Sequence, residues 1–182
     1  MITLLFAGAL LLGDGTPKDS AAPYACTIPL TISDSLQHHN TLIMGVDPRA
    51  TYGFDMALGE MPIPPILPPP LFDVRFMDPL NRKQPIPGNG AYDDIRRYES
   101  PAQADTFFVR VQPAEGGLPL LVRWPHGLGG SAKQGELMVK APAGPANVDM
   151  MTADSVYVRG GDTHDIRIIV GQWIMPAGMP AK

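Results

Sequence analysis

Two adjacent aspartates are the acidic pair of this sequence that could support hydrolysis. Asp93 and Asp94 follow Tyr92, and glycoside hydrolysis uses two carboxylates placed on either side of the bond that is cleaved. Neighbouring residues of a strand point to opposite faces, so this pair alone does not provide that geometry. A turn or a strand-end cap is the favoured interpretation. A hydrolase that uses Asp93 or Asp94 with a histidine is therefore the least favoured function, and we expect no enzyme.

The four histidines add little to this chemistry. His38 and His39 fall in an expected hairpin loop, where a metal site would need further ligands. His126 lies near Ser131, but no Gly-x-Ser-x-Gly sequence marks that serine as a nucleophile. We expect His38 and His39 to be ordinary surface residues, and we expect no serine-based catalytic triad.

An acidic loop offers the best candidate for a metal ion. Asp47 and Asp55 bracket a segment that contains Thr51 and Gly53, and carboxylates with nearby carbonyl and hydroxyl oxygens suit Ca²⁺. The loop lacks the regular aspartate spacing of a calcium hand, and aspartates also stabilise turns through local backbone hydrogen bonds. The turn interpretation is the stronger. We therefore expect no cofactor, with Ca²⁺ at Asp47 and Asp55 as the alternative.

The aromatic residues suggest a second kind of ligand. Exposed aromatic rings bind sugars by stacking, and the candidates for such a platform are Tyr92, Tyr98, Trp124, Tyr157 and Trp173, with the two tryptophans put first. Trp124 ends an apolar strand and Trp173 follows the last expected strand. Tryptophans in these positions are more often part of the core or of its rim. A carbohydrate-binding surface at Trp124 and Trp173 is thus an alternative to a purely structural role.

Proline and glycine decide the expected fold class. The 182 residues include 21 prolines and 19 glycines, a combined share well above the roughly 12% of average usage. Proline removes backbone donors and fixes φ, so few long helices are expected. The hydrophobic content of 45% and the net charge of -4 argue against disorder of the whole chain. With a pI near 5.4 there is no basic footprint, so nucleic acid is excluded as an expected partner.

Short apolar segments, each bounded by turn residues, predict about nine strands. Cys26, Ile28, Leu30 and Ile32 alternate onto one face, and Pro29 indicates an edge strand. This spacing is typical of an antiparallel β-sandwich, jelly-roll or immunoglobulin-like. The expected strands are 26–32, 40–46, 71–77, 106–111, 118–124, 135–140, 147–151, 155–159 and 165–170, with hairpins at 26–46 and 106–124, a turn at 160–162 and one possible helical turn at 93–98.

A proline-rich segment follows the acidic loop. Six prolines lie between Met61 and Pro70, which favours polyproline II, a conformation without internal hydrogen bonds. Its apolar residues Ile63, Ile66 and Leu67 suggest that it lies along a surface. We expect residues 47–76 to act as a structural brace, in which the proline run crosses between the two sheets.

The N-terminus has two interpretations. Residues 1–13 form an apolar run that is too short to span a bilayer, so no membrane span is expected. Its length suits the apolar part of a signal peptide, although no basic residue precedes Lys18. The alternative is a structural arm that adds a strand to the sheet of a neighbour, as could 26–32. Residues 1–23 are thus a signal-like segment or arm plus linker, 24–175 one sandwich domain, and 176–182 a tail.

Three segments resemble a known kind of module. The sequence Asp47-Pro48-Arg49-Ala50-Thr51-Tyr52-Gly53-Phe54-Asp55, the prolines that follow it and Phe72-Asp73-Val74-Arg75-Phe76 resemble a β-sandwich module of secreted bacterial surface proteins, often cargo of type IX secretion. Tyr52 replaces an aspartate that is usual in this module. The resemblance covers about residues 26–171. It implies a secreted or cell-surface protein without an enzyme signature.

Together these features predict a non-catalytic extracellular or cell-surface module with a structural, adhesive or self-assembly role, such as a fibre or surface-layer subunit. The expected partners are other copies of the chain or other cell-surface proteins, reached through N-terminal strand addition, or a polysaccharide.

Overall fold

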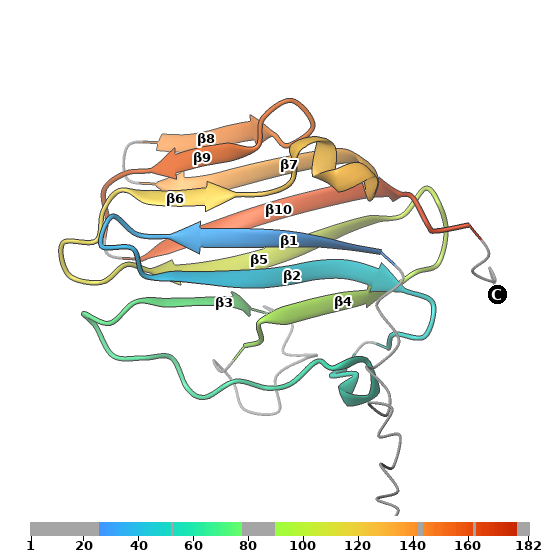
Figure 1. Ribbon diagram of the computed structural model, residues 1–182, viewed down its shortest axis with the longest axis horizontal. Helices are drawn as coiled ribbons and strands as arrows, with labels where there is room; N and C mark the ends of the chain where they lie inside the picture. The colour runs from blue at the N-terminus through green and yellow to red at the C-terminus, as the bar shows by residue number, and fades with distance from the viewer. Residues whose placement is uncertain (1–25, 52, 78–89, 142–143, 162, 178–182) are drawn as a thin grey trace, which may run out of the picture.

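The fold is a β-sandwich of two five-stranded sheets packed face to face (Figure 1). The computed structural model describes residues 26–51, 53–77, 90–141, 144–161 and 163–177. Sheet A has the order β4-β2-β1-β6-β9 and sheet B the order β3-β5-β10-β7-β8. The strands are β1 (Cys26–Ser33), β2 (His39–Asp47), β3 (Asp73–Met77), β4 (Asp93–Arg97), β5 (Ala104–Gln112), β6 (Leu120–Arg123), β7 (Ala132–Ala141), β8 (Gly144–Asp149), β9 (Ser155–Val158) and β10 (His164–Trp173).

The expected fold class is confirmed, and the described residues contain no α-helix. Alternation along the strands produces the sandwich, because every second residue faces the partner sheet. In β1 the residues of the buried face are Cys26, Ile28, Leu30 and Ile32, as the sequence pattern predicts. They join residues of both sheets in one hydrophobic core.

Strand β1 corrects one expectation. Pro29 indicated an edge strand, but β1 lies in the centre of sheet A between β2 and β6. Strand β6 pairs only with Thr31, Ile32 and Ser33, so Pro29 lies outside that paired stretch and its missing N–H removes no bond to β6. Because β6 pairs only with residues 31–33, the side of residues 26–30 that faces away from β2 is not paired with β6, and addition of this segment to a neighbour's sheet stays a prediction.

The turn expected at 160–162 contains Gly160 and Gly161, which both have positive φ, and it follows β9 and precedes β10; Asp162 lies outside the described residues. Two other expected elements differ. Residues 106–124 do not form a hairpin, because β5 belongs to sheet B and β6 to sheet A. Residues 93–97 form strand β4, parallel to β2, and no helical turn. In each case long-range pairing decides the structure, which local turn signals do not reveal.

The proline-rich segment does cross between the sheets, since it connects β2 of sheet A with β3 of sheet B. Three polar side chains contact the backbone of this segment and are here called the Arg75 cluster: Asp73, Arg75 and Gln112. Arg75 Nε donates to Asp73 Oδ1 at 2.6 Å, and Arg75 Nη1 donates to the carbonyl of Pro64 at 2.7 Å. Gln112 Nε2 donates to the carbonyls of Leu67 and Leu71 at 3.1 and 2.7 Å. The buried polar side chains of β3 and β5 thus hold the backbone of the proline-rich segment against sheet B.

A left-handed turn closes one end of the sandwich. In the segment η2 (His126–Gly130), Gly127, Leu128 and Gly129 have φ values of 56, 55 and 63°. Leu128 is fully buried in this conformation, which costs a non-glycine residue about 1–2 kcal/mol. Its side chain packs against Gly135, where an added Cβ would lie 2.7 Å from Leu128 Cδ1. The hydrophobic contact offsets the backbone strain.

The free edges of the sheets are poorly suited to pairing with another chain. Strand β9 has four residues, and β8 contains Pro145, which has no N–H to donate. Strand β4 carries Asp93, Asp94, Arg96 and Arg97 among its five residues, and Ala91 bridges to Phe76 of β3. Short, charged, proline-containing or covered edges are the features that disfavour edge-to-edge association.

Candidate functional site

The carboxylate of Asp47 is engaged by its own loop. Asp47 ends β2 and is fully buried. Its Oδ1 accepts from the backbone N–H and the Nε of Arg49 at 2.7 and 2.9 Å, and its Oδ2 accepts from Arg49 Nη2 at 2.7 Å. Hydrogen bonding to the Asp47 carboxylate raises the pKa of Arg49. A cation at Asp47 would have to displace this guanidinium.

Asp55 makes a separate local contact. Its Oδ2 accepts from the Thr51 N–H at 2.7 Å, and its Oδ1 accepts from Thr51 Oγ1 at 2.9 Å. The fully buried Glu60 accepts from the Asp55 N–H at 2.9 Å and from the Ile95 N–H at 2.7 Å. Sequence reasoning missed Glu60, whose only signal is an acidic residue at the start of an apolar, proline-rich run. Within the described ranges, no three His, Cys, Asp or Glu residues group as metal ligands would.

Both tryptophans are buried. Trp124 is 5% exposed and its Nε1 donates to the carbonyls of Met150 and Ala153 at 3.1 and 2.9 Å. Trp173 is 3% exposed and its Nε1 donates to Asp105 Oδ2 at 2.8 Å. Neither ring offers the open face on which a sugar stacks. Both rings belong to the hydrophobic core, the position that the sequence favoured over a sugar-binding platform.

Asp94 and Asp105 form a partly buried polar group between the sheets. Asp94 Oδ2 accepts from Arg96 Nη2 at 2.7 Å, and the Arg96 guanidinium lies 5.4 Å from the centre of the Phe107 ring. Burial raises the pKa of Asp105, while hydrogen bonds from Gln103 and Trp173 oppose the rise. Asp94, the inward member of the acidic pair, thus has an arginine partner in the sandwich and lines neither of the hollows described below.

The remaining residues considered for catalysis are in structural positions. His38 Nδ1 lies 2.8 Å from Asp34 Oδ2, and its ring stacks on Phe72 at 5.9 Å. His39 Nδ1 lies 3.2 Å from the carbonyl of Gln37. Ser131 Oγ donates to the carbonyl of Thr27 at 2.9 Å, so its proton is directed to the backbone rather than to an imidazole.

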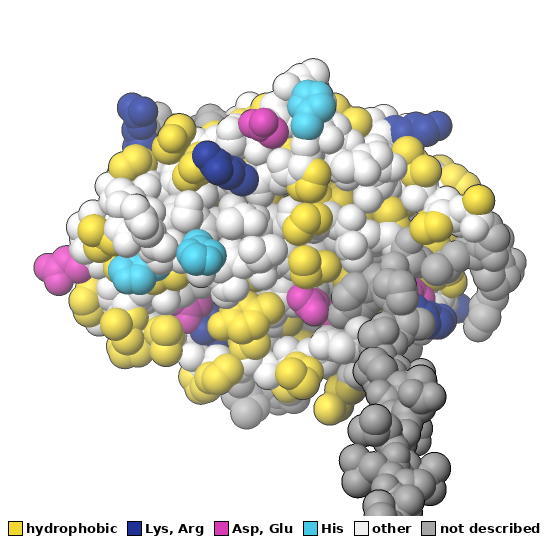
Figure 2. All heavy atoms as spheres, viewed as in Figure 1, with side chains coloured by type: hydrophobic (Ala, Val, Ile, Leu, Met, Phe, Trp, Pro, Cys, Tyr) yellow, Lys and Arg dark blue, Asp and Glu magenta, His cyan; other side chains and the backbone are white. Residues whose placement is uncertain are grey.

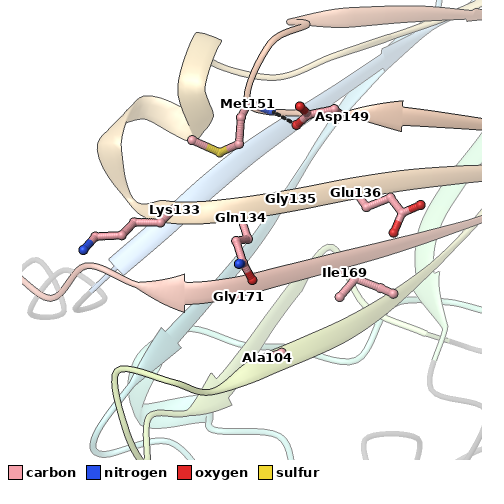
Figure 3. Close-up of a pocket in the computed structure, with 9 residues that line it drawn as sticks. All are labelled: Ala104, Lys133, Gln134, Gly135, Glu136, Asp149, Met151, Ile169 and Gly171. Atoms are coloured by element: carbon pink, nitrogen blue, oxygen red, sulfur yellow. Dashed lines mark hydrogen bonds between the residues drawn. The ribbon is translucent and has the colours of Figure 1, made fainter.

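The open hollow on the outer face of sheet B is a site that sequence reasoning did not find (Figure 3). It has a volume of about 390 Å³ and lies over β7, β10 and β5. A second hollow of about 390 Å³ adjoins it over β7 and β8 and shares Gly135, Glu136 and Asp149. No sequence signal marks this place, because its residues come from four different strands and the turn after β8. The side chains that line the first hollow include Lys133, Gln134, Glu136, Asp149, Met151 and Ile169.

The surface and the comparisons with known proteins complete this description. Lysine and arginine side chains stand apart on the face shown in Figure 2, with no basic patch there. No helix among the residues that the structure describes is long and apolar enough to cross a membrane. No protein-family model matches the chain, and no curated protein or solved structure matches it either. The resemblance to secreted bacterial surface modules therefore stays a prediction.

Proposed function

We propose that this chain is a non-catalytic, secreted or cell-surface β-sandwich module with a structural or adhesive role. The observation that carries this proposal is what the polar side chains of the chain bind. Asp47, Asp55 and Glu60 hold the acidic loop, and Asp73 and Arg75 hold the proline-rich segment. These polar residues thus stabilise the connection that crosses between the sheets.

The apolar run at residues 1–13 supports export, which also fits the resemblance stated above. This run lies outside the described residues. Self-assembly through it therefore remains a separate version of the proposal. The short, charged or covered edges of the sheets favour a discrete module over edge-to-edge assembly.

Native mass and native size of the full chain, measured over a hundredfold range of concentration, test these versions. A monomer of 19.6 kDa or less at every concentration is the expected result. Growth of assemblies with concentration would support the self-assembly version instead. Steady release of product from polysaccharide or peptide substrates by the pure protein would overturn the non-catalytic role. Protease treatment of intact cells should remove the protein if it lies at the surface.

A further inference from the structure

The hollow on sheet B is formed around two small residues on neighbouring strands, Gly171 of β10 and Ala104 of β5, which pair with each other. On its other side Gly171 pairs with Gln134 of β7. Because the two small residues carry little or no side chain, the larger side chains around them form the walls of the hollow (Figure 3).

The backbone conformation at position 171 does not require a glycine. It is not one of the glycines with positive φ, so an L-residue could adopt its conformation. A Cβ added there would lie 3.2 Å from Gln134 Oε1 and 3.5 Å from Ala104 Cβ. It would therefore stand in the hollow rather than in the core. Glycine inside a strand weakens it and often marks a place where a ligand approaches the backbone closely.

The walls combine an apolar surface with planar polar groups. Ile169 is partly exposed on β10, next to Glu136 in the register of β7. Glu136 pairs across the sheet with Asp149 of β8, whose Oδ1 accepts from the Met151 N–H at 2.8 Å. Gln134 supplies both a donor and an acceptor. Specific ligand sites typically pair such an apolar surface with a few polar groups that fix orientation.

We propose that this hollow binds sugar rings of a neutral polysaccharide. A sugar ring has an apolar C–H face, which fits Ile169, and a rim of hydroxyl groups, which can donate to Glu136 and Asp149. The two carboxylates outnumber the single cation, Lys133, so the lining repels polyanions. This inference deepens the adhesive part of the proposed function, on which it rests, and it transfers sugar binding from the buried tryptophans to an exposed face.

Substitution of Ala104 by tyrosine tests the site without touching the core. Ala104 is exposed and lies opposite Gly171, and an aromatic ring across from a strand glycine stabilises the pair. The probes are cellohexaose, maltohexaose, mannohexaose and chitohexaose, titrated against the full chain by calorimetry and by affinity electrophoresis with the matching polymers. We expect binding of at least one of them, at least a tenfold loss in Ala104→Tyr, and a smaller loss in Glu136→Ala.

Arg123→Ala is the matched control, because Arg123 is exposed on β6 of the other sheet. It should leave binding within twofold of the native protein. Absence of binding to all four probes overturns the sugar site, as does equal binding by Ala104→Tyr with an unchanged melting temperature. Tighter binding of heparin or alginate than of the neutral probes also overturns it. None of these results touches the structural role, which native mass and melting temperature report separately.

Discussion

The Arg75 cluster allows the contribution of the proline-rich crossing to be measured. Asp73 and Arg75 have side chains that are 5% and 3% exposed. Arg75→Met keeps the apolar length of the side chain but leaves the Asp73 carboxylate buried without its guanidinium, and it removes the donor to Pro64. Removing one partner of a buried ion pair costs about 3–5 kcal/mol. That is a large part of the 5–15 kcal/mol by which domains are usually stable.

For a chain of this size, 1 kcal/mol corresponds to about 2–4 °C of melting temperature. Arg75→Met should therefore melt about 6–20 °C below the native protein in scanning calorimetry. The double variant Asp73→Asn, Arg75→Met removes the uncompensated charge and should recover part of the lost melting temperature. The melting temperature of Arg75→Lys should lie between those of the native protein and Arg75→Met. Arg123→Met is the control, because Arg123 is exposed on β6, and it should change stability by less than about 0.5 kcal/mol.

Two outcomes would refute this reasoning. A loss below about 1 kcal/mol in Arg75→Met would place the pair in the range of exposed ion pairs. A double variant that is as unstable as the sum of the single variants would show that the two side chains do not act together.

Two further predictions concern the acidic loop and the buried acid. Asp55→Ala should lower the melting temperature by about 2–12 °C, because it removes two hydrogen bonds from Thr51, each worth about 0.5–1.5 kcal/mol. Glu115→Ala, at an exposed position, is the control, and an unchanged melting temperature of Asp55→Ala would argue against a brace. Burial raises the pKa of Asp105, whose neighbours are Gln103, Trp173, Arg96 and Asp94. The folded protein therefore keeps this proton to higher pH than the unfolded chain, and its contribution to stability is lost as pH rises through the folded pKa. Melting temperatures of the native protein relative to Asp105→Asn should fall from acidic to neutral pH, and a rise would contradict the assignment.

Period-two alternation predicted nine of the ten described strands and the fold class, because burial of one strand face produces a local pattern in the sequence. It missed β4, where charged residues occupy four of the five positions. No such local pattern in the sequence indicates which strands pair with each other. The turn residues at 113–117 predicted a hairpin, yet β5 and β6 belong to different sheets. Pro29 predicted an edge, although a central strand tolerates proline where its neighbour ends early. Glu60 escaped notice because its partner, Ile95, lies 35 residues away.

The brace and the hollow occupy different parts of the same sheet. The Arg75 cluster lies over β3 and the end of β5 at Gln112, whereas the hollow lies over β7, β10 and the start of β5 at Ala104. Strand β5 contributes to both, and it pairs with β10 along eight positions from His164 to Gly171. A ligand in the hollow therefore meets a surface whose strand positions are fixed without it. Such preorganisation reduces the entropy lost on binding. A rigid sandwich whose crossing connection is held by buried hydrogen bonds is thus the expected support for an adhesive face. Substitutions in the Arg75 cluster should change stability, whereas substitutions in the hollow should change binding.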